Sequence, residues 1–67
     1  GMVELEFQAA ASITYRILYQ DHIGDEEWIL LQEVPAMNIP DSIRILDTVT
    51  QTITRRFYRL EAKRVGD

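Results

Sequence analysis

Four acidic side chains gather around the single histidine of this chain, and such a group is the first place to look for chemistry. The acids are Asp21, Asp25, Glu26 and Glu27, and His22 lies among them. Clustered carboxylates in a turn can hold Ca²⁺, but this spacing lacks the alternating acids followed by glycine of an EF-hand loop. We therefore expect solvated loop acids, with calcium binding at residues 25–27 as the minor alternative, and we predict no metal ligand.

Nucleophilic catalysis finds no support in the residues around the histidine. His22 has no cysteine partner, because the chain contains none, and neither Ser12 nor Ser42 has the strand–turn–helix context of a nucleophilic serine. The sequence also lacks a glycine-rich phosphate-binding loop. We expect no catalytic residue and no cofactor, so a small enzyme or enzyme subunit is the least favoured function.

Charge pairing is the other chemistry that the sequence offers. Asp47 ends one predicted strand, and Arg56 and Arg59 lie in another. A carboxylate and a guanidinium without a nucleophile define no reaction class. They can form a half-buried ion pair that holds two strands together. We predict that Asp47 and Arg56 form a structural clamp on the last strand, with Arg59 as the alternative partner.

The charges are unevenly distributed along the chain. The net charge is −4, with seven acids and one base in residues 1–36 and four acids and six bases in residues 37–67. A nucleic-acid-binding domain is typically basic, so no nucleic-acid partner is expected. Acidic and basic strands lying side by side would form cross-strand pairs. The cations of residues 55–64 could bind phosphate or an acidic polymer, but protection of a sheet edge is the favoured explanation.

Alternation of apolar and polar residues predicts strands along most of the sequence. Val3, Leu5 and Phe7 alternate with Glu4 and Glu6, which is the period of a half-buried strand. The predicted strands cover about residues 2–10, 13–21, 27–34, 42–47 and 55–64. The β-branched segment 48–54 is predicted to be strand or extended loop, because β-branched residues disfavour helix.

The third predicted strand and its flanks carry special signals. Ile29, Leu30 and Leu31 put apolar groups on both faces, which indicates either a central strand or a bulge. Gly24, in the turn before it, can adopt a positive φ. Pro35 cannot donate a ladder hydrogen bond, so we expect pairing to end there.

Five short strands with turn signals between them predict an all-β domain, either a reduced antiparallel sandwich or a partly open barrel. The 67 residues allow one domain at most, near the lower size limit for a core that is stable alone. We assign residues 2–67 to it, because Gly1 before Met2 looks like the remnant of a cleaved tag. No apolar run approaches the roughly 20 residues of a membrane span. Since no disulfide can support so small a core, we expect good packing, a partner chain or a larger parent protein.

Large apolar side chains are expected to fill the core rather than form a site. The predicted core residues are Phe7, Tyr15, Ile17, Trp28, Leu31, Ile45 and Phe57. Because neighbouring residues of a strand face opposite ways, placing Phe57 inside turns Tyr58 outward. We therefore predict Tyr58, Arg55 and Arg59 as contacts to a partner. Exposed aromatics that stack on sugar rings are the alternative.

The order of these motifs resembles the small fibronectin type III-like β-sandwich modules near the C-termini of large secreted bacterial proteins. The resemblance is carried by Tyr15-Arg16-Ile17-Leu18-Tyr19, Trp28, Asp47 and Arg56-Phe57-Tyr58-Arg59, and it spans roughly residues 5–60. Two departures stand out. Ser12-Ile13-Thr14 stands where those modules often have a glycine, and five strands are found where a full fibronectin fold has seven.

The resemblance implies an immunoglobulin- or fibronectin-like sandwich with no catalytic residues. It implies an extracellular or cell-surface location, as part of a larger exported protein. The function would be that of a spacer, docking or adhesion domain that contacts neighbouring domains or another protein. Carbohydrate binding to a polysaccharide is the alternative. A strand missing from the fold would leave an edge open, so pairing of edge strands in a homodimer is a further possibility.

Overall fold

The computed structural model describes residues 1–22, 24, 27–49 and 55–65, and these residues form five strands. The strands are β1 (Met2–Ala9), β2 (Ile13–Gln20), β3 (Ile29–Val34), β4 (Asp41–Thr48) and β5 (Phe57–Arg64). The predicted all-β class is confirmed, and each predicted strand is found within two residues of its expected start. Most of the segment predicted as strand or extended loop, residues 50–54, lies outside the described residues.

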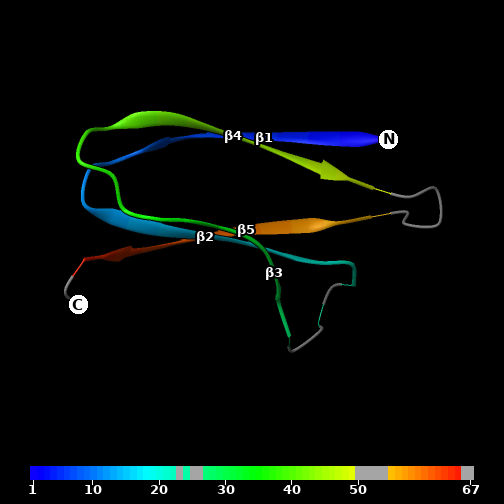
Figure 1. Ribbon diagram of the computed structural model, residues 1–67. Helices are drawn as coiled ribbons and strands as arrows, with labels where there is room; N and C mark the ends of the chain where they lie inside the picture. Colours follow the sequence, from blue (N-terminus) through cyan, green and yellow to red (C-terminus); the bar gives the residue numbers. More distant parts are fainter. Residues whose placement is uncertain (23, 25–26, 50–54, 66–67) are drawn as a thin grey trace.

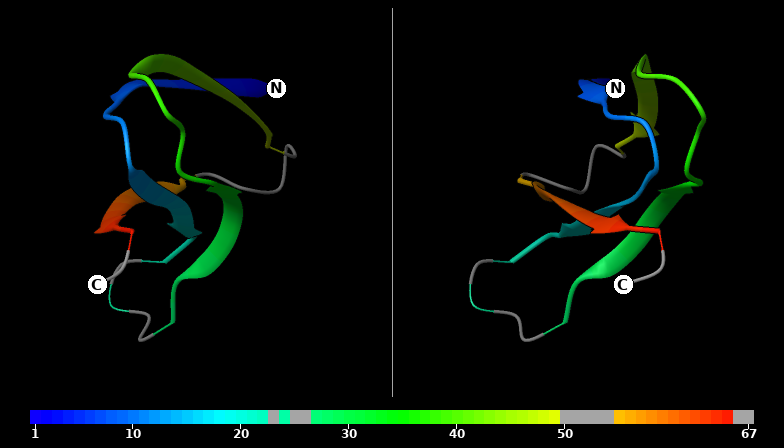
Figure 2. Two further views of the ribbon diagram at one scale, coloured as in Figure 1. Left: turned by 60° about the vertical axis from the view of Figure 1, so that its left-hand side comes forward. Right: turned by 90° about the vertical axis from the view of Figure 1, so that its left-hand side faces the viewer.

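The strands form two antiparallel sheets that face each other (Figure 1). One sheet pairs β1 with β4, and the other has the order β3-β2-β5. The chain crosses from the first sheet to the second between β1 and β2, as the views in Figure 2 show. This arrangement fits the predicted small sandwich, and the strands of the described residues do not form a closed barrel.

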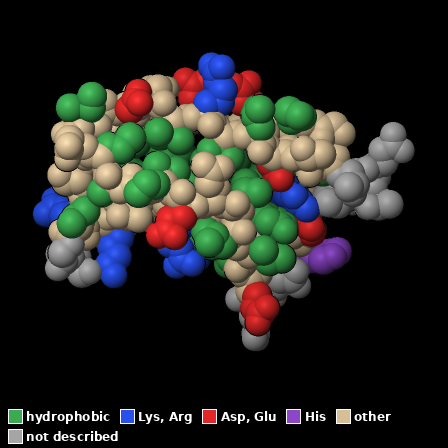
Figure 3. Space-filling view, in the orientation of Figure 1, with side chains coloured by type: hydrophobic (Ala, Val, Ile, Leu, Met, Phe, Trp, Pro, Cys, Tyr) green, Lys and Arg blue, Asp and Glu red, His purple; other side chains and the backbone are tan. Residues whose placement is uncertain are grey.

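Alternation along the strands sends one set of side chains into the space between the sheets. The buried core residues are Ala9, Tyr15, Ile17, Val34 and Ile45. Leu5, Phe7, Ile13, Leu31, Met37 and Ile43 pack against them. The rings of Phe7 and Tyr15 meet at a centroid distance of 5.0 Å, which joins the two sheets. Figure 3 shows hydrophobic side chains between the layers and charged side chains on both outer surfaces.

The register of β5 places Phe57 and Tyr58 opposite to their predicted orientations. Tyr58 pairs with Tyr19, on the inner side of β2, and Phe57 pairs with Gln20, on the outer side. Phe57 is half-buried on that outer face rather than in the core. Trp28 also lies outside the core, half-buried just before β3. Tyr58 faces inward because its hydroxyl donates a hydrogen bond to the buried carboxylate of Asp47 between the sheets.

Strand β3 lies at the edge of its sheet and contains the irregularity that its sequence signalled. Ile17 pairs with Gln32 while Leu18 pairs with Leu30, so Leu31 is an extra residue in β3. A bulge of this kind changes which residues face the core. Because of the bulge, Leu31 packs against the core although it is paired with no residue of β2.

On the outer face of the β1–β4 sheet, the acidic and basic halves of the chain meet. The Arg44 Nε atom lies 2.5 Å from Glu4 Oε1, and its Nη2 atom lies 3.8 Å from Glu6 Oε2. All three side chains are at least half exposed. Exposed pairs contribute little to stability, because water and salt screen them. These contacts therefore fix register more than they hold the fold.

The turn between β1 and β2 contains Ser12 in a left-handed conformation, with φ of 64°. Its backbone N–H donates to the Met37 carbonyl at 2.9 Å, and its carbonyl accepts from the Val65 N–H at 3.2 Å. These two hydrogen bonds hold Ser12 in a left-handed conformation that residues other than glycine seldom adopt.

We expect Ser12→Gly to raise the free energy of unfolding by about 0.5 kcal/mol, because the relief of strain exceeds the added entropy of the unfolded chain. Ser12→Val is expected to lower it by about 1–2 kcal/mol, because a β-branched side chain clashes more strongly at positive φ. Chemical denaturation of the three proteins measures both effects. Equal stabilities would show that the turn is not strained.

Candidate interaction face and its anchoring ion cluster

The start of β5 is held by an ion cluster between the two sheets. Arg56, just before β5, donates from Nε to Asp21 Oδ1 at 2.7 Å and from Nη2 to Asp21 Oδ2 at 3.2 Å. Its Nη1 atom donates to Asp47 Oδ2 at 3.0 Å. Asp21 follows β2 and Asp47 belongs to β4, so the Arg56 guanidinium links the start of β5 both to the end of β2 in its own sheet and to β4 in the other sheet. The predicted contact between Asp47 and Arg56 is present, while Arg59 lies elsewhere.

Two tyrosines complete this cluster. The Tyr58 hydroxyl donates to Asp47 Oδ2 at 2.7 Å, and the Arg56 guanidinium carbon lies 4.1 Å from the centroid of the Tyr19 ring. The side chains of Arg56 and Asp47 are only 10% and 6% exposed. Among the described residues, every buried side-chain nitrogen and oxygen has a hydrogen-bond partner. A buried charge that is so fully paired acts as a structural element.

The electrostatics of the cluster favour its present protonation state. Burial, followed by the hydrogen bond to the Asp47 carboxylate, raises the pKa of Tyr58 to about 12. The hydrogen bond from Arg56 lowers the pKa of Asp21, and the same bond raises the pKa of the Arg56 guanidinium above its ordinary value. Tyr58 therefore stays neutral at neutral pH and donates its proton to the hydrogen bond with Asp47.

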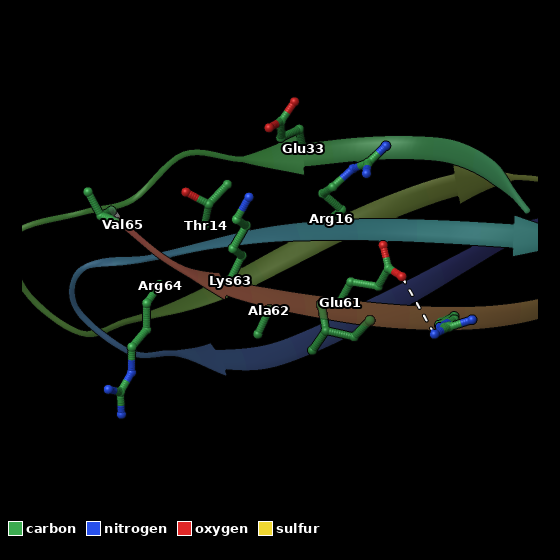
Figure 4. A pocket seen from close by; sticks show the side chains of 10 residues that line it. Thr14, Arg16, Glu33, Glu61, Ala62, Lys63, Arg64 and Val65 are labelled. Carbon is green, nitrogen blue, oxygen red and sulfur yellow. Dashed lines mark ion pairs between the residues drawn. The ribbon is translucent and has the colours of Figure 1, made fainter. Parts of the chain in front are cut away.

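The outer face of the three-stranded sheet presents a different set of side chains. From the register, Arg16 lies opposite Glu33 on one side and Glu61 on the other. Thr14 lies opposite Lys63. These residues border a shallow hollow of about 960 Å³, which extends along β5 to Val65 (Figure 4). We call the surface formed by Thr14, Arg16, Glu33, Arg59, Glu61 and Lys63 the outer face.

The outer face is more basic than the chain as a whole. Arg16, Arg59 and Lys63 contribute three positive charges, and Glu33 and Glu61 contribute two negative ones. The Arg59 Nη2 atom lies 3.6 Å from Glu61 Oε2, and both side chains remain accessible to water. Thus a chain of net charge −4 displays a slight excess of cations on this sheet face.

The predicted partner contacts divide between two locations. Arg59 lies on the outer face, and Arg55 is exposed just before β5. Tyr58 instead points between the sheets and bonds Asp47. Sequence reasoning missed Asp21 and Tyr19 as members of the ion cluster. Only the position of Tyr19, on the same face of β2 as Tyr15 and Ile17, could have signalled its inward orientation.

Aromatic rings that could stack on a sugar are largely engaged. The Arg59 guanidinium carbon lies 5.9 Å from the Trp28 ring centroid, in the range of a cation–π contact. Tyr19 is covered by Arg56, and Phe7 and Tyr15 meet in the core. A sugar platform would need an open aromatic face. The ring contacts therefore do not favour carbohydrate binding.

The acidic turn can be followed only in part. Asp25 and Glu26 lie outside the described residues, and Asp21 is paired with Arg56 rather than directed at a shared centre. Across residues 1–22, 24, 27–49 and 55–65, no group of three or more histidine, cysteine, aspartate or glutamate side chains is placed to hold a metal ion. The same residues include no helix of the length and apolar character needed to cross a membrane.

Comparison of the chain with protein-family models, curated proteins and solved structures found no match. The likeness to fibronectin type III-like modules therefore stays a prediction from sequence motifs.

Proposed function

We propose that this chain is a non-catalytic β-sandwich module of a larger exported protein that docks an acidic segment of a partner protein on its outer face. The carrying observation is the placement of Arg16, Arg59 and Lys63 around one shallow hollow in an otherwise acidic chain. The sheet beneath these cations is preformed, so binding would cost little conformational entropy. Spacer or adhesive roles within the parent protein follow from the same contact.

The spacing of the cations along β5 suggests which acidic segments would bind. Arg59 and Lys63 face the same way and are four residues apart, which is roughly 13 Å along a strand. An extended partner with acidic residues at the same spacing would meet both cations. Glu61, between them, would disfavour a partner with a continuous run of acids. The ion cluster supports this reading, because it fixes the beginning of the strand that carries both cations.

Nuclear magnetic resonance titration tests the proposal with three defined probes: a peptide with Glu at every fourth position and Thr between, its counterpart with Lys in place of Glu, and cellohexaose. We expect the acidic peptide to shift the amide signals of Thr14, Arg16 and residues 59–63, and added salt to weaken binding. Replacing two cations, in Arg16→Glu/Lys63→Glu, is expected to weaken binding on the order of tenfold.

Arg44→Glu is the control for net charge, because Arg44 is an exposed arginine on the opposite sheet and its replacement makes half the charge change of the double variant. It is expected to bind the acidic peptide like the unmodified chain. Equal weakening by Arg44→Glu would mean that net charge alone drives the binding. Signal shifts with cellohexaose around Trp28, and none with the acidic peptide, would replace protein docking by carbohydrate binding.

A further inference from the structure

The sandwich is open on the side where β1 and β5 lie. A second hollow, of about 220 Å³, is lined mainly by apolar side chains of Leu5, Phe7, Ile17 and Leu60. Leu60 faces the other sheet, yet it is 47% exposed. In the described part of the chain, β1 has only β4 as a neighbour and β5 has only β2. Two free strand edges therefore border an uncovered part of the core.

The hydrogen-bonding direction of β5 can be deduced from its end. The Val65 N–H donates to the Ser12 carbonyl, which makes these two residues a hydrogen-bonded pair. In an antiparallel ladder such pairs alternate with pairs whose N–H and C=O groups point away from the partner strand. Counting back along the register, the backbone groups of Leu60 and Ala62 point away from β2, toward the free edge.

The charges of β5 suit a second copy of the same strand. Arg59, Glu61 and Lys63 alternate in sign along one face. If two copies pair antiparallel with Leu60 opposite Leu60, each Glu61 lies opposite Arg59 of the other copy. Sliding the pairing so that Glu61 meets Glu61 places Arg59 against Lys63, and both contacts are repulsive. Centring the pairing on Ala62 would place Glu61 opposite Lys63, which is also attractive, but it would place each Leu60 opposite Arg64. The charges therefore disfavour the register centred on Glu61, and the exposed Leu60 side chains favour the register centred on Leu60.

We propose that two copies of this chain associate through β5, antiparallel about a two-fold axis at Leu60, and so cover the apolar hollow beside β1. Such an interface is closed, because the same surface is used on both subunits. The alternating charges on this edge then disfavour the register centred on Glu61, in which like charges meet. This interface uses the edge of β5, and it does not depend on ligand binding at the outer face.

Sedimentation equilibrium over a range of concentrations tests the interface. The unmodified chain is expected to show a monomer–dimer equilibrium. Ala62→Pro is expected to be monomeric, because proline removes an N–H that faces the free edge and leaves the bonds to β2 intact. Leu60→Lys is also expected to be monomeric. Its control is Leu46→Lys, which changes another exposed leucine (59% exposed) on the far sheet and should still dimerise.

Exchanging the charges of Glu61 and Arg59 distinguishes specific pairing of the two β5 strands from nonspecific association. Glu61→Lys is expected to raise the dimer dissociation constant on the order of tenfold, because two cross-strand attractions become repulsions. Adding Arg59→Glu to this variant should restore dimerisation, because the side chains at positions 59 and 61 that face each other across the interface then carry opposite charges again. Circular dichroism confirms that each variant is folded. A chain that stays monomeric up to about 1 mM, or a dimer that survives Leu60→Lys and Ala62→Pro, would overturn the proposal.

Discussion

Asp47→Asn is expected to lower the free energy of unfolding by about 3 kcal/mol, because it leaves Arg56 partly unpaired in a place that water hardly reaches. Asp47 accepts hydrogen bonds from both Arg56 and Tyr58. A domain of this size has a total stability of only a few kcal/mol, so much of the variant should be unfolded at 37 °C. Urea denaturation followed by circular dichroism measures the loss.

Asp21→Asn is the matched comparison for Asp47→Asn. The Asp21 side chain is 31% exposed, so water can replace more of what is lost, and the destabilisation should be smaller. The double replacement Asp47→Leu/Arg56→Met removes both charges together and should recover part of the stability. Equal losses for the two asparagine variants would contradict a clamp that depends on the contact between the sheets.

The second large effect is a loss of stability at alkaline pH that depends on Tyr58. Its pKa is raised from an ordinary value of 10.0 to about 12 in the folded chain, chiefly by burial. The folded state therefore holds this proton more tightly than the unfolded state does. Its contribution to stability is fully present below pH 10 and is lost as the pH rises toward 12. The expected loss is on the order of 2 kcal/mol.

Tyr58→Phe isolates this effect. Phenylalanine keeps the ring and has no proton to release, so the variant should show a flatter stability profile between pH 10 and pH 12. At neutral pH it should be less stable than the unmodified chain by about 1–2 kcal/mol, because Asp47 loses a donor. Denaturation curves at a series of pH values provide the test. Parallel profiles for the two proteins would assign the alkaline loss to other groups.

Strand positions could be predicted because alternation is a local property of the sequence. Val3, Leu5 and Phe7 face the core as expected, and Asp41–Thr48 follows the same rule with Ile43 and Ile45 inside. Local signals were ambiguous for β3. Its apolar run fitted a central strand or a bulge, and only pairing with β2 shows that it is a bulged edge strand.

The orientation of β5 could not be derived from hydrophobicity. Phe57 is more apolar than Tyr58, so apolarity alone puts Phe57 inside. The structure places Tyr58 inside because Asp47, from a strand in the other sheet, accepts its hydroxyl. The clamp between Asp47 and Arg56 was predictable from charge and position, whereas Asp21 looked like one of several loop acids. Which acid reaches Arg56 depends on how the ends of β2 and β4 meet, and that is a tertiary property.

The strand order has a consequence for how the chain is made. β1 pairs with β4, and β2 pairs with β5, so both sheets join segments that are distant in sequence. Only the pairing of β2 with β3 links strands that follow one another. Long-range pairing of this kind folds slowly, on the order of milliseconds to seconds. The sandwich therefore cannot close while residues 57–64 are still inside the ribosome, and native structure must form after that segment emerges.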